Sequence, residues 1–152
     1  MEFGKLPLTG ERKAEEYRKT KHVERQLNFS PDGRWLAYVS VESGQPQVFI
    51  RGYPEERGKW QISSESGLGP LWRGDGKELY WTSGGQLMAA SIDLQPAGIR
   101  AGKQEPLFPI GTAYPFGNSA DGRRFLFVED AAGPAKELPM VVIRNWAARL
   151  AK

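Results

Sequence analysis

Short runs in which apolar and polar residues alternate recur along the chain, and glycine or proline separates most of them. Alternation with a period of two residues is typical of strands that bury one face. The runs are also rich in aromatic and β-branched residues, which favour strands. The pattern therefore predicts an all-β fold. Besides three hairpins at Asp-Gly pairs, the expected strands cover residues 5–9, 15–20, 47–51, 59–63, 86–92, 106–110 and 138–146.

An Asp-Gly pair stands between such runs three times, in FSPDGRWLAYVS, LWRGDGKELYWTS and FGNSADGRRFLFVED. Asp-Gly in this setting is a strong hairpin signal, because glycine adopts a positive φ without steric cost. The aspartates are Asp32, Asp75 and Asp121, which lie 43 and 46 residues apart. Propeller blades repeat at about 40–50 residues. The repeat therefore predicts a β-propeller, with about three four-stranded antiparallel blades in this chain.

This repeat divides the chain into four parts. Residues 1–24 form an N-terminal strand segment, residues 25–64 and 65–110 form two blades, and residues 111–152 form a third blade with a C-terminal tail. We expect the N-terminal segment to complete the last blade, either of its own chain or of a partner chain. Known propellers have about four to eight blades, so three do not close a ring. We expect two copies to form a six-bladed ring as a homodimer; the alternative is a fragment that pairs with nothing.

Composition narrows the functional classes. The 152 residues carry a formal charge of +3 from 21 basic and 18 acidic residues, which is too weak and too mixed to indicate nucleic-acid binding. The absence of cysteine excludes disulfides and thiolate metal sites. We expect no signal peptide in this chain, because its first residues contain no apolar core, and no membrane insertion, because no apolar run approaches about 20 residues.

The side chains most often used in catalysis have simpler structural interpretations. His22 is the only histidine, and no GxSxG motif accompanies it, so the sequence predicts no Ser-His-Asp triad. The three repeat aspartates precede glycine in hairpins, where Asp accepts hydrogen bonds from its own backbone. We therefore predict no catalytic site, no metal and no cofactor.

The tryptophans fall in strands of successive repeats, so we expect them in the core between blades rather than on a stacking platform. They are Trp35, Trp60, Trp72, Trp81 and Trp146.

Propeller geometry indicates where a binding site would lie. Segments that join the last strand of one blade to the first strand of the next open onto the mouth of the central channel, and here they cover residues 21–25, 65–69 and 111–114. The residues expected to form a binding rim there are His22, Arg25, Leu68 and Tyr114. Such a rim would take a protein or a small-molecule ligand.

The phrase FSPDGRWLAYVS, with QVFIR and KWQIS after it, resembles the repeat of TolB-like propellers, a subgroup of the WD-repeat-like class. LWRGDGKELYWTS, QLMAASI and the ending VVIRNWAARLAK resemble the C-terminal propeller of certain bacterial membrane-bound serine/threonine protein kinases. This resemblance spans the chain from Leu6 onward. It implies a non-catalytic, sensor-like domain on the extracytoplasmic or periplasmic side of a signalling protein. No kinase motif is present in the chain itself.

A non-catalytic binding or scaffold module is the function that these features favour. One alternative is an isolated propeller fragment with only a structural role. Another is a propeller hydrolase or lactonase, which would need several carboxylates, amides or histidines around a metal. A single histidine and three hairpin aspartates do not provide that set.

Overall fold

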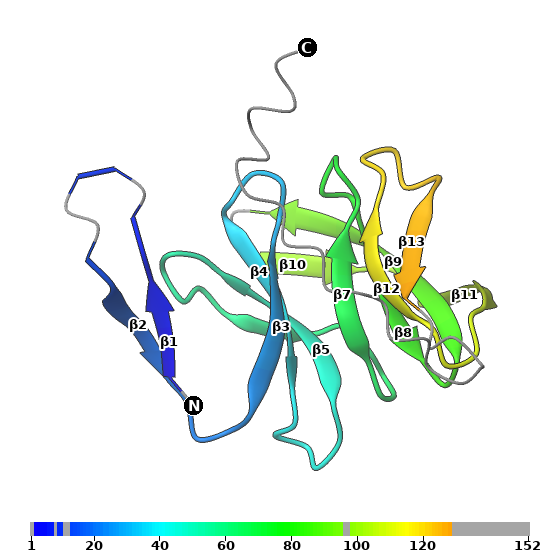
Figure 1. The fold of residues 1–152 in the computed structure, drawn as a ribbon, viewed down its shortest axis with the longest axis horizontal. Coiled ribbons are helices and arrows are strands. Elements are labelled where there is room, and N and C mark those ends of the chain that lie inside the picture. The colour runs from blue at the N-terminus through cyan, green and yellow to red at the C-terminus, as the bar shows by residue number, and fades with distance from the viewer. Residues whose placement is uncertain (1, 8, 11–12, 96–97, 129–152) are drawn as a thin grey trace, which may run out of the picture.

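The computed structural model describes residues 2–7, 9–10, 13–95 and 98–128. These residues form strands, turns and loops without any helix, so the all-β prediction is confirmed for them. Their strands make four separate antiparallel sheets (Figure 1). The strand predicted at 138–146, with Trp146, lies outside the described residues.

Three of these sheets follow the Asp-Gly repeat, each beginning with the strand before the pair. The first sheet has the strand order of the sequence: β3 (Glu24–Phe29), β4 (Trp35–Ser40), β5 (Gln47–Gly52) and β6 (Lys59–Gln61). The second sheet contains β7 (Leu68–Trp72), β8 (Glu78–Ser83), β9 (Gln86–Gln95), β10 (Gly98–Ala101) and β11 (Glu105–Pro109). The third sheet is the hairpin of β12 (Tyr114–Asn118) and β13 (Phe125–Val128).

The second sheet has one strand more than the four predicted. β9 is ten residues long, and its first half pairs with β11. Its second half extends beyond the residues that pair with β11. β10 pairs with this second half in antiparallel orientation. The extra strand therefore results from the length of β9, which the apolar run predicted only as far as residue 92.

The predicted Asp-Gly hairpins join the first two strands of all three sheets. Gly33, Gly76 and Gly122 have φ values of 68°, 71° and 68°. These near-identical positive angles are rarely adopted by residues that carry a side chain. The repeat in the sequence is therefore also a repeat of backbone conformation.

The main core lies between the first and second sheets. Alternate residues of β4 and β5 meet Trp72 and Trp81 of the second sheet in one cluster of buried apolar side chains. A smaller cluster around Tyr80 and Leu87 joins the second sheet to the third, where Phe125 packs edge-on against Tyr80 at 4.9 Å between ring centroids. The predicted place of the tryptophans between sheets is confirmed for Trp35, Trp60, Trp72 and Trp81.

An N-terminal hairpin, formed by β1 (Glu2–Lys5) and β2 (Glu15–Lys19), lies beside the first sheet (Figure 1). The strand predicted at 15–20 is present, but the strand predicted at 5–9 is wrong. Lys5 is the last residue of β1, and it pairs with Glu15. Pro7 cannot donate a backbone hydrogen bond to a ladder, so the chain leaves the sheet before it. Completion of the last blade by this hairpin stays a prediction.

We expect Trp81→Ala to destabilise the fold by about 3–5 kcal/mol, because it opens a cavity in the core between the sheets. Trp81 is 1% exposed and contacts side chains of both sheets. Urea unfolding followed by circular dichroism measures this change. Leu6→Ala is the matched control: Leu6 is 57% exposed, so its truncation should change the free energy of unfolding by less than about 0.5 kcal/mol. Equal losses in the two variants would contradict the assigned core.

Candidate functional site

The first strands of the three sheets, β3, β7 and β12, lie next to one another (Figure 1). Each has an irregularity in its pairing with the second strand of its own sheet, close to its start. A β-bulge of this kind inserts one residue into a strand and bends it locally. The three sheets thus present the same distortion at the same end.

The distorted residues connect one sheet to the next. Gln26 of β3 has a φ of 54°, and its side-chain oxygen accepts a hydrogen bond of 2.9 Å from the backbone N–H of Gly69. Gly69 is the equivalent residue of the second sheet and has a φ of 60°. A Cβ built on Gly69 would lie 3.5 Å from Cγ of Pro115, the equivalent residue of the third sheet. Three equivalent residues therefore lie close to one another in series.

Side chains at the far ends of these strands continue the connection. The indole N–H of Trp72 donates to the backbone carbonyl of Asn28 in the preceding sheet at 3.3 Å. The side-chain amide of Asn118 donates to the carbonyl of Trp72 at 3.1 Å. Each junction between sheets thus combines apolar packing with hydrogen bonds to the backbone, which fix the relative position of the strands.

A pocket of about 470 Å³ opens where the bulges meet the turns of the second and third sheets. We call it the glycine-rich pocket. Its lining comes from Gln26, Ser66, Leu68, Gly69, Pro115 and residues 82–85 and 110–113. None of these side chains is charged. The pocket therefore offers hydroxyl, amide and backbone groups, together with apolar contact, to a neutral group of a ligand.

The structure brings part of the predicted rim to this pocket. Leu68 lines it. The residues directly before and after Tyr114 in the sequence also line it. Arg25 precedes the lining residue Gln26 in β3. His22 is exposed between β2 and β3 and is not among the lining residues; its backbone N–H donates to the Thr20 hydroxyl at 3.2 Å. A binding role for the four residues stays a prediction.

Sequence reasoning missed the turn at residues 82–85, which lines the same pocket. The predicted rim covered only the segments between blades. In an antiparallel sheet, however, the turn from the second to the third strand lies at the same end as the start of the first strand. Gly84 and Gly85, between two strand-like runs, were the signal for this turn.

The repeat aspartates act as turn residues, as predicted. Oδ1 of Asp32, Asp75 and Asp121 accepts a hydrogen bond from the backbone N–H two residues later, at 3.1, 3.0 and 3.0 Å. Their carboxylates are therefore already occupied within the turns. In the described ranges, no three His, Cys, Asp or Glu side chains gather in a group that could hold a metal ion.

Hydrogen bonding lowers the pKa of two of these aspartates. Burial acts to raise the pKa of Asp32, but hydrogen bonds from Ser30 and Arg34 outweigh it, and the pKa is lowered. The Ser119 hydroxyl, 2.5 Å from Asp121 Oδ1, together with a backbone N–H, lowers the pKa of Asp121 in the same way. Serine thus repeats the same role in the first and third turns.

The second turn replaces this serine by Arg73. Nε and Nη2 of Arg73 donate to the two carboxylate oxygens of Asp75 at 2.8 and 2.9 Å. This paired contact, followed by the hydrogen bond from the backbone N–H of Lys77, lowers the pKa of Asp75 to about 2.

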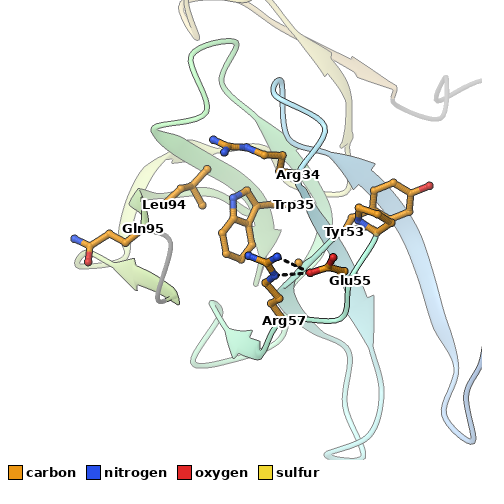
Figure 2. A pocket seen from close by; sticks show the side chains of 9 residues that line it. Arg34, Trp35, Tyr53, Glu55, Arg57, Leu94 and Gln95 are labelled. Carbon is orange, nitrogen blue, oxygen red and sulfur yellow. Dashed lines mark hydrogen bonds and ion pairs between the residues drawn. The ribbon is translucent and has the colours of Figure 1, made fainter.

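A second pocket, of about 340 Å³, lies at the opposite ends of the strands (Figure 2). The indole of Trp35 and the side chain of Leu94 form apolar parts of its wall. Arg57 lies beside them, but its Nε and Nη2 donate to Glu55 at 2.8 and 2.5 Å. Arg34, also in the lining, is paired with Asp32 at 2.8 Å. The arginines of this Trp35 pocket are therefore already neutralised.

The repeated antiparallel sheets, with their first strands side by side, are typical of β-propeller blades. Among solved structures, the chain is similar to the crystal structure of TolB from Acinetobacter baumannii, with a TM-score of 0.57 and 20% sequence identity. The match covers 87% of this chain and 33% of the TolB chain. At this identity the likeness shows the fold alone, which is TolB-like. No protein-family model matches the chain, and no curated protein matches it in sequence. Within the described residues, no helix is long and apolar enough to cross a bilayer.

We expect Asp75→Asn to remove part of the acid sensitivity of the fold. The pKa of Asp75 is depressed in the folded state, so the stabilisation is present above the unfolded value of 3.8 and is lost as the pH falls toward about 2. Urea unfolding at pH 6, 4, 3 and 2.5 measures it. The native protein should lose more stability over this window than the variant, and equal slopes would contradict the assigned contact.

Proposed function

We propose that the chain is a non-catalytic propeller module that binds a partner polypeptide at the glycine-rich pocket. The observation that carries this proposal is the convergence of three successive first strands and the turn at 82–85 on one neutral pocket. Ligand sites in proteins are concave, with about 300–1,000 Å³ of volume and a few directed polar groups. The volume of about 470 Å³ and the hydroxyl and backbone groups of the lining fit that description.

A segment of polypeptide is the ligand that this chemistry favours. Its backbone N–H and C=O groups would meet the hydroxyls of Thr82 and Thr112 and the amide of Gln26. The neutral lining provides no counter-charge for a strongly anionic or cationic ligand. The rim predicted from His22, Arg25, Leu68 and Tyr114 belongs to this proposal; of the four, Leu68 is among the residues that line the pocket.

A sensor-like role in a bacterial signalling protein, on the extracytoplasmic or periplasmic side, is part of the proposal. It rests on the resemblance of LWRGDGKELYWTS and the C-terminal ending to the propellers of membrane-bound serine/threonine kinases. A purely structural fragment is the alternative, and a chain without any bound partner would favour it.

Assembly of two copies into a six-bladed ring is the second element of the proposal. Leu126 of β13 lies five residues after its repeat aspartate, where the first two sheets have Ala37 and Tyr80. Those two are buried against the next sheet at 0% and 2% exposure, whereas Leu126 is 61% exposed. Phe29 is likewise 51% exposed, although its counterpart Trp72 is buried against the preceding sheet. The first and third sheets thus each expose an apolar residue at a position that is buried where two described sheets meet. This favours another copy of the same repeat as the partner that covers both residues.

Light scattering after size-exclusion chromatography tests the assembly. We expect a mass of two chains of 17.0 kDa each. Leu126→Glu should shift the mass to one chain, because it places a charge in the junction. Leu107→Glu, on the exposed strand β11, is the matched control and should leave the dimer intact. A single-chain mass for the native protein would contradict the ring.

Peptide selection tests the pocket. Peptides selected from a displayed random library on the immobilised protein should bind at least tenfold more weakly to Thr112→Arg, because the longer side chain fills the glycine-rich pocket. Gln95→Arg, which places the same side chain in the Trp35 pocket at the opposite end, is the control and should bind normally. Isothermal titration gives both affinities. The reverse ranking would place binding at the Trp35 pocket and overturn the proposal.

A further inference from the structure

The face of the first sheet that points away from the second sheet has an unusual composition. We call it the outer face. Tyr38 on this face corresponds to Trp81 in the second sheet, since both lie six residues after the repeat aspartate. Across the ladder, Arg51 stands where the second sheet has Ala90. Two positions that hold the apolar core residues Trp81 and Ala90 in the second sheet therefore hold a polar and a charged residue in the first.

These polar groups are nevertheless buried. Arg51 is 1% exposed, and Tyr38 and Ser40 are fully buried. Glu24 accepts a hydrogen bond of 3.3 Å from Nη1 of Arg51. The N-terminal hairpin contributes Tyr17, whose ring centroid lies 5.7 Å from the Arg51 guanidinium carbon; the Tyr38 ring lies at 4.6 Å. The guanidinium is thus held by two rings and one carboxylate.

The hairpin also supplies a second guanidinium at the rim of this cluster. Arg18 lies 3.7 Å from Glu24 and 2.5 Å from Glu56. Glu24 therefore stands between two arginines, and the Arg18–Glu56 pair forms the solvent side. The charges of the two arginines are balanced by these two carboxylates, so the four side chains together carry no net charge.

Several buried donors in this cluster have no hydrogen-bond partner. They are Nε and Nη2 of Arg51, Nε of Arg18 and the hydroxyls of Tyr17, Tyr38 and Ser40. A buried donor without a partner costs about 1–3 kcal/mol, and more when it is charged. Every one of these groups can donate a hydrogen bond, and the arginine nitrogens can only donate. A group that satisfies the cluster must therefore bring acceptors, and preferably acceptor oxygens alone.

The unpaired edge of Arg51 specifies the shape of that acceptor. Nε and Nη2 carry two parallel N–H bonds, which match the two oxygens of one carboxylate. The chain uses this same edge twice on its surface: Arg73 contacts both carboxylate oxygens of Asp75 with it, and Arg57 contacts one carboxylate oxygen of Glu55. In the outer-face cluster no carboxylate of the described residues takes that place, because Glu24 contacts Nη1.

The geometry points to a carboxylate-binding site on the outer face, in which the Nε/Nη2 edge of Arg51 forms a paired contact with a carboxylate and the Tyr38 and Ser40 hydroxyls donate to it. The site is separate from the glycine-rich pocket, so it does not depend on peptide binding there; only the second-copy source of the carboxylate would share the proposed dimer. The carboxylate belongs either to a small organic acid or to a side chain of a second copy, and the experiment distinguishes these sources.

Side-chain NMR of the full chain labelled with ¹⁵N-arginine tests the site with acetate as the probe. Acetate, exchanged for chloride at constant ionic strength, should shift the Arg51 Nε–H signal in a saturable way. Arg51→Lys identifies that signal and should abolish the rise in melting temperature that bound acetate causes. Tyr38→Phe keeps Arg51 and should weaken acetate binding about tenfold, as expected for one lost hydrogen bond to a charged group. Arg57→Lys is the control at an exposed pair and should bind acetate normally.

The second source has its own readout. If the carboxylate comes from a second copy, acetate causes no saturable shift, the native protein is a dimer, and Arg51→Lys lowers its mass to one chain while Arg57→Lys does not. The carboxylate site is refuted if acetate and chloride have the same effect on the Arg51 Nε–H signal and both lysine variants have the same mass as the native protein. Water alone then satisfies the donors.

Discussion

Packing between neighbouring sheets is the interaction on which the rest of this structure depends. Each inner sheet has two faces that must be covered, and a single sheet has no second layer against which to bury them. Trp72 and Trp81 cover one face of the first sheet and are themselves covered by it. The glycine-rich pocket exists only because this packing brings Gln26, Leu68 and Pro115 of different sheets to one place. A site of this kind is a property of the junction rather than of any single strand.

Local features of the fold could be predicted from the sequence because their causes are local. The Asp-Gly hairpins follow from the conformational freedom of glycine, and the burial of Trp81 follows from the apolar run of residues 79–81 in its strand. The β10 strand could not be predicted, since it exists only where β9 extends beyond its other partner. The positive φ of Gln26 has no signal in the sequence either, because its partner, the Gly69 backbone, lies 43 residues away.

The candidate site was predictable in position but not in composition. Segments joining successive sheets were expected at one end of the strands, and Leu68 is found in the pocket there. The turn at 82–85 was missed because its place depends on strand direction and not on the repeat itself. Arg51 gave a signal that a local pattern does not interpret: a charge at the end of the apolar run QVFIR. Its partner Glu24 lies 27 residues earlier, so only the folded sheet shows why the charge is tolerated.

The hydrogen bonds from Trp72 to Asn28 and from Asn118 to Trp72 run in one direction, each from a later sheet to the one before it. The series of sheets therefore has a direction, and its two ends differ. A repeat that carries a donor such as Trp72 or Asn118 at this position would recreate the same hydrogen bond to the sheet before it, in one orientation only. Growth or shortening of such a protein during evolution would then proceed by whole repeats, because a partial one leaves a donor without its carbonyl.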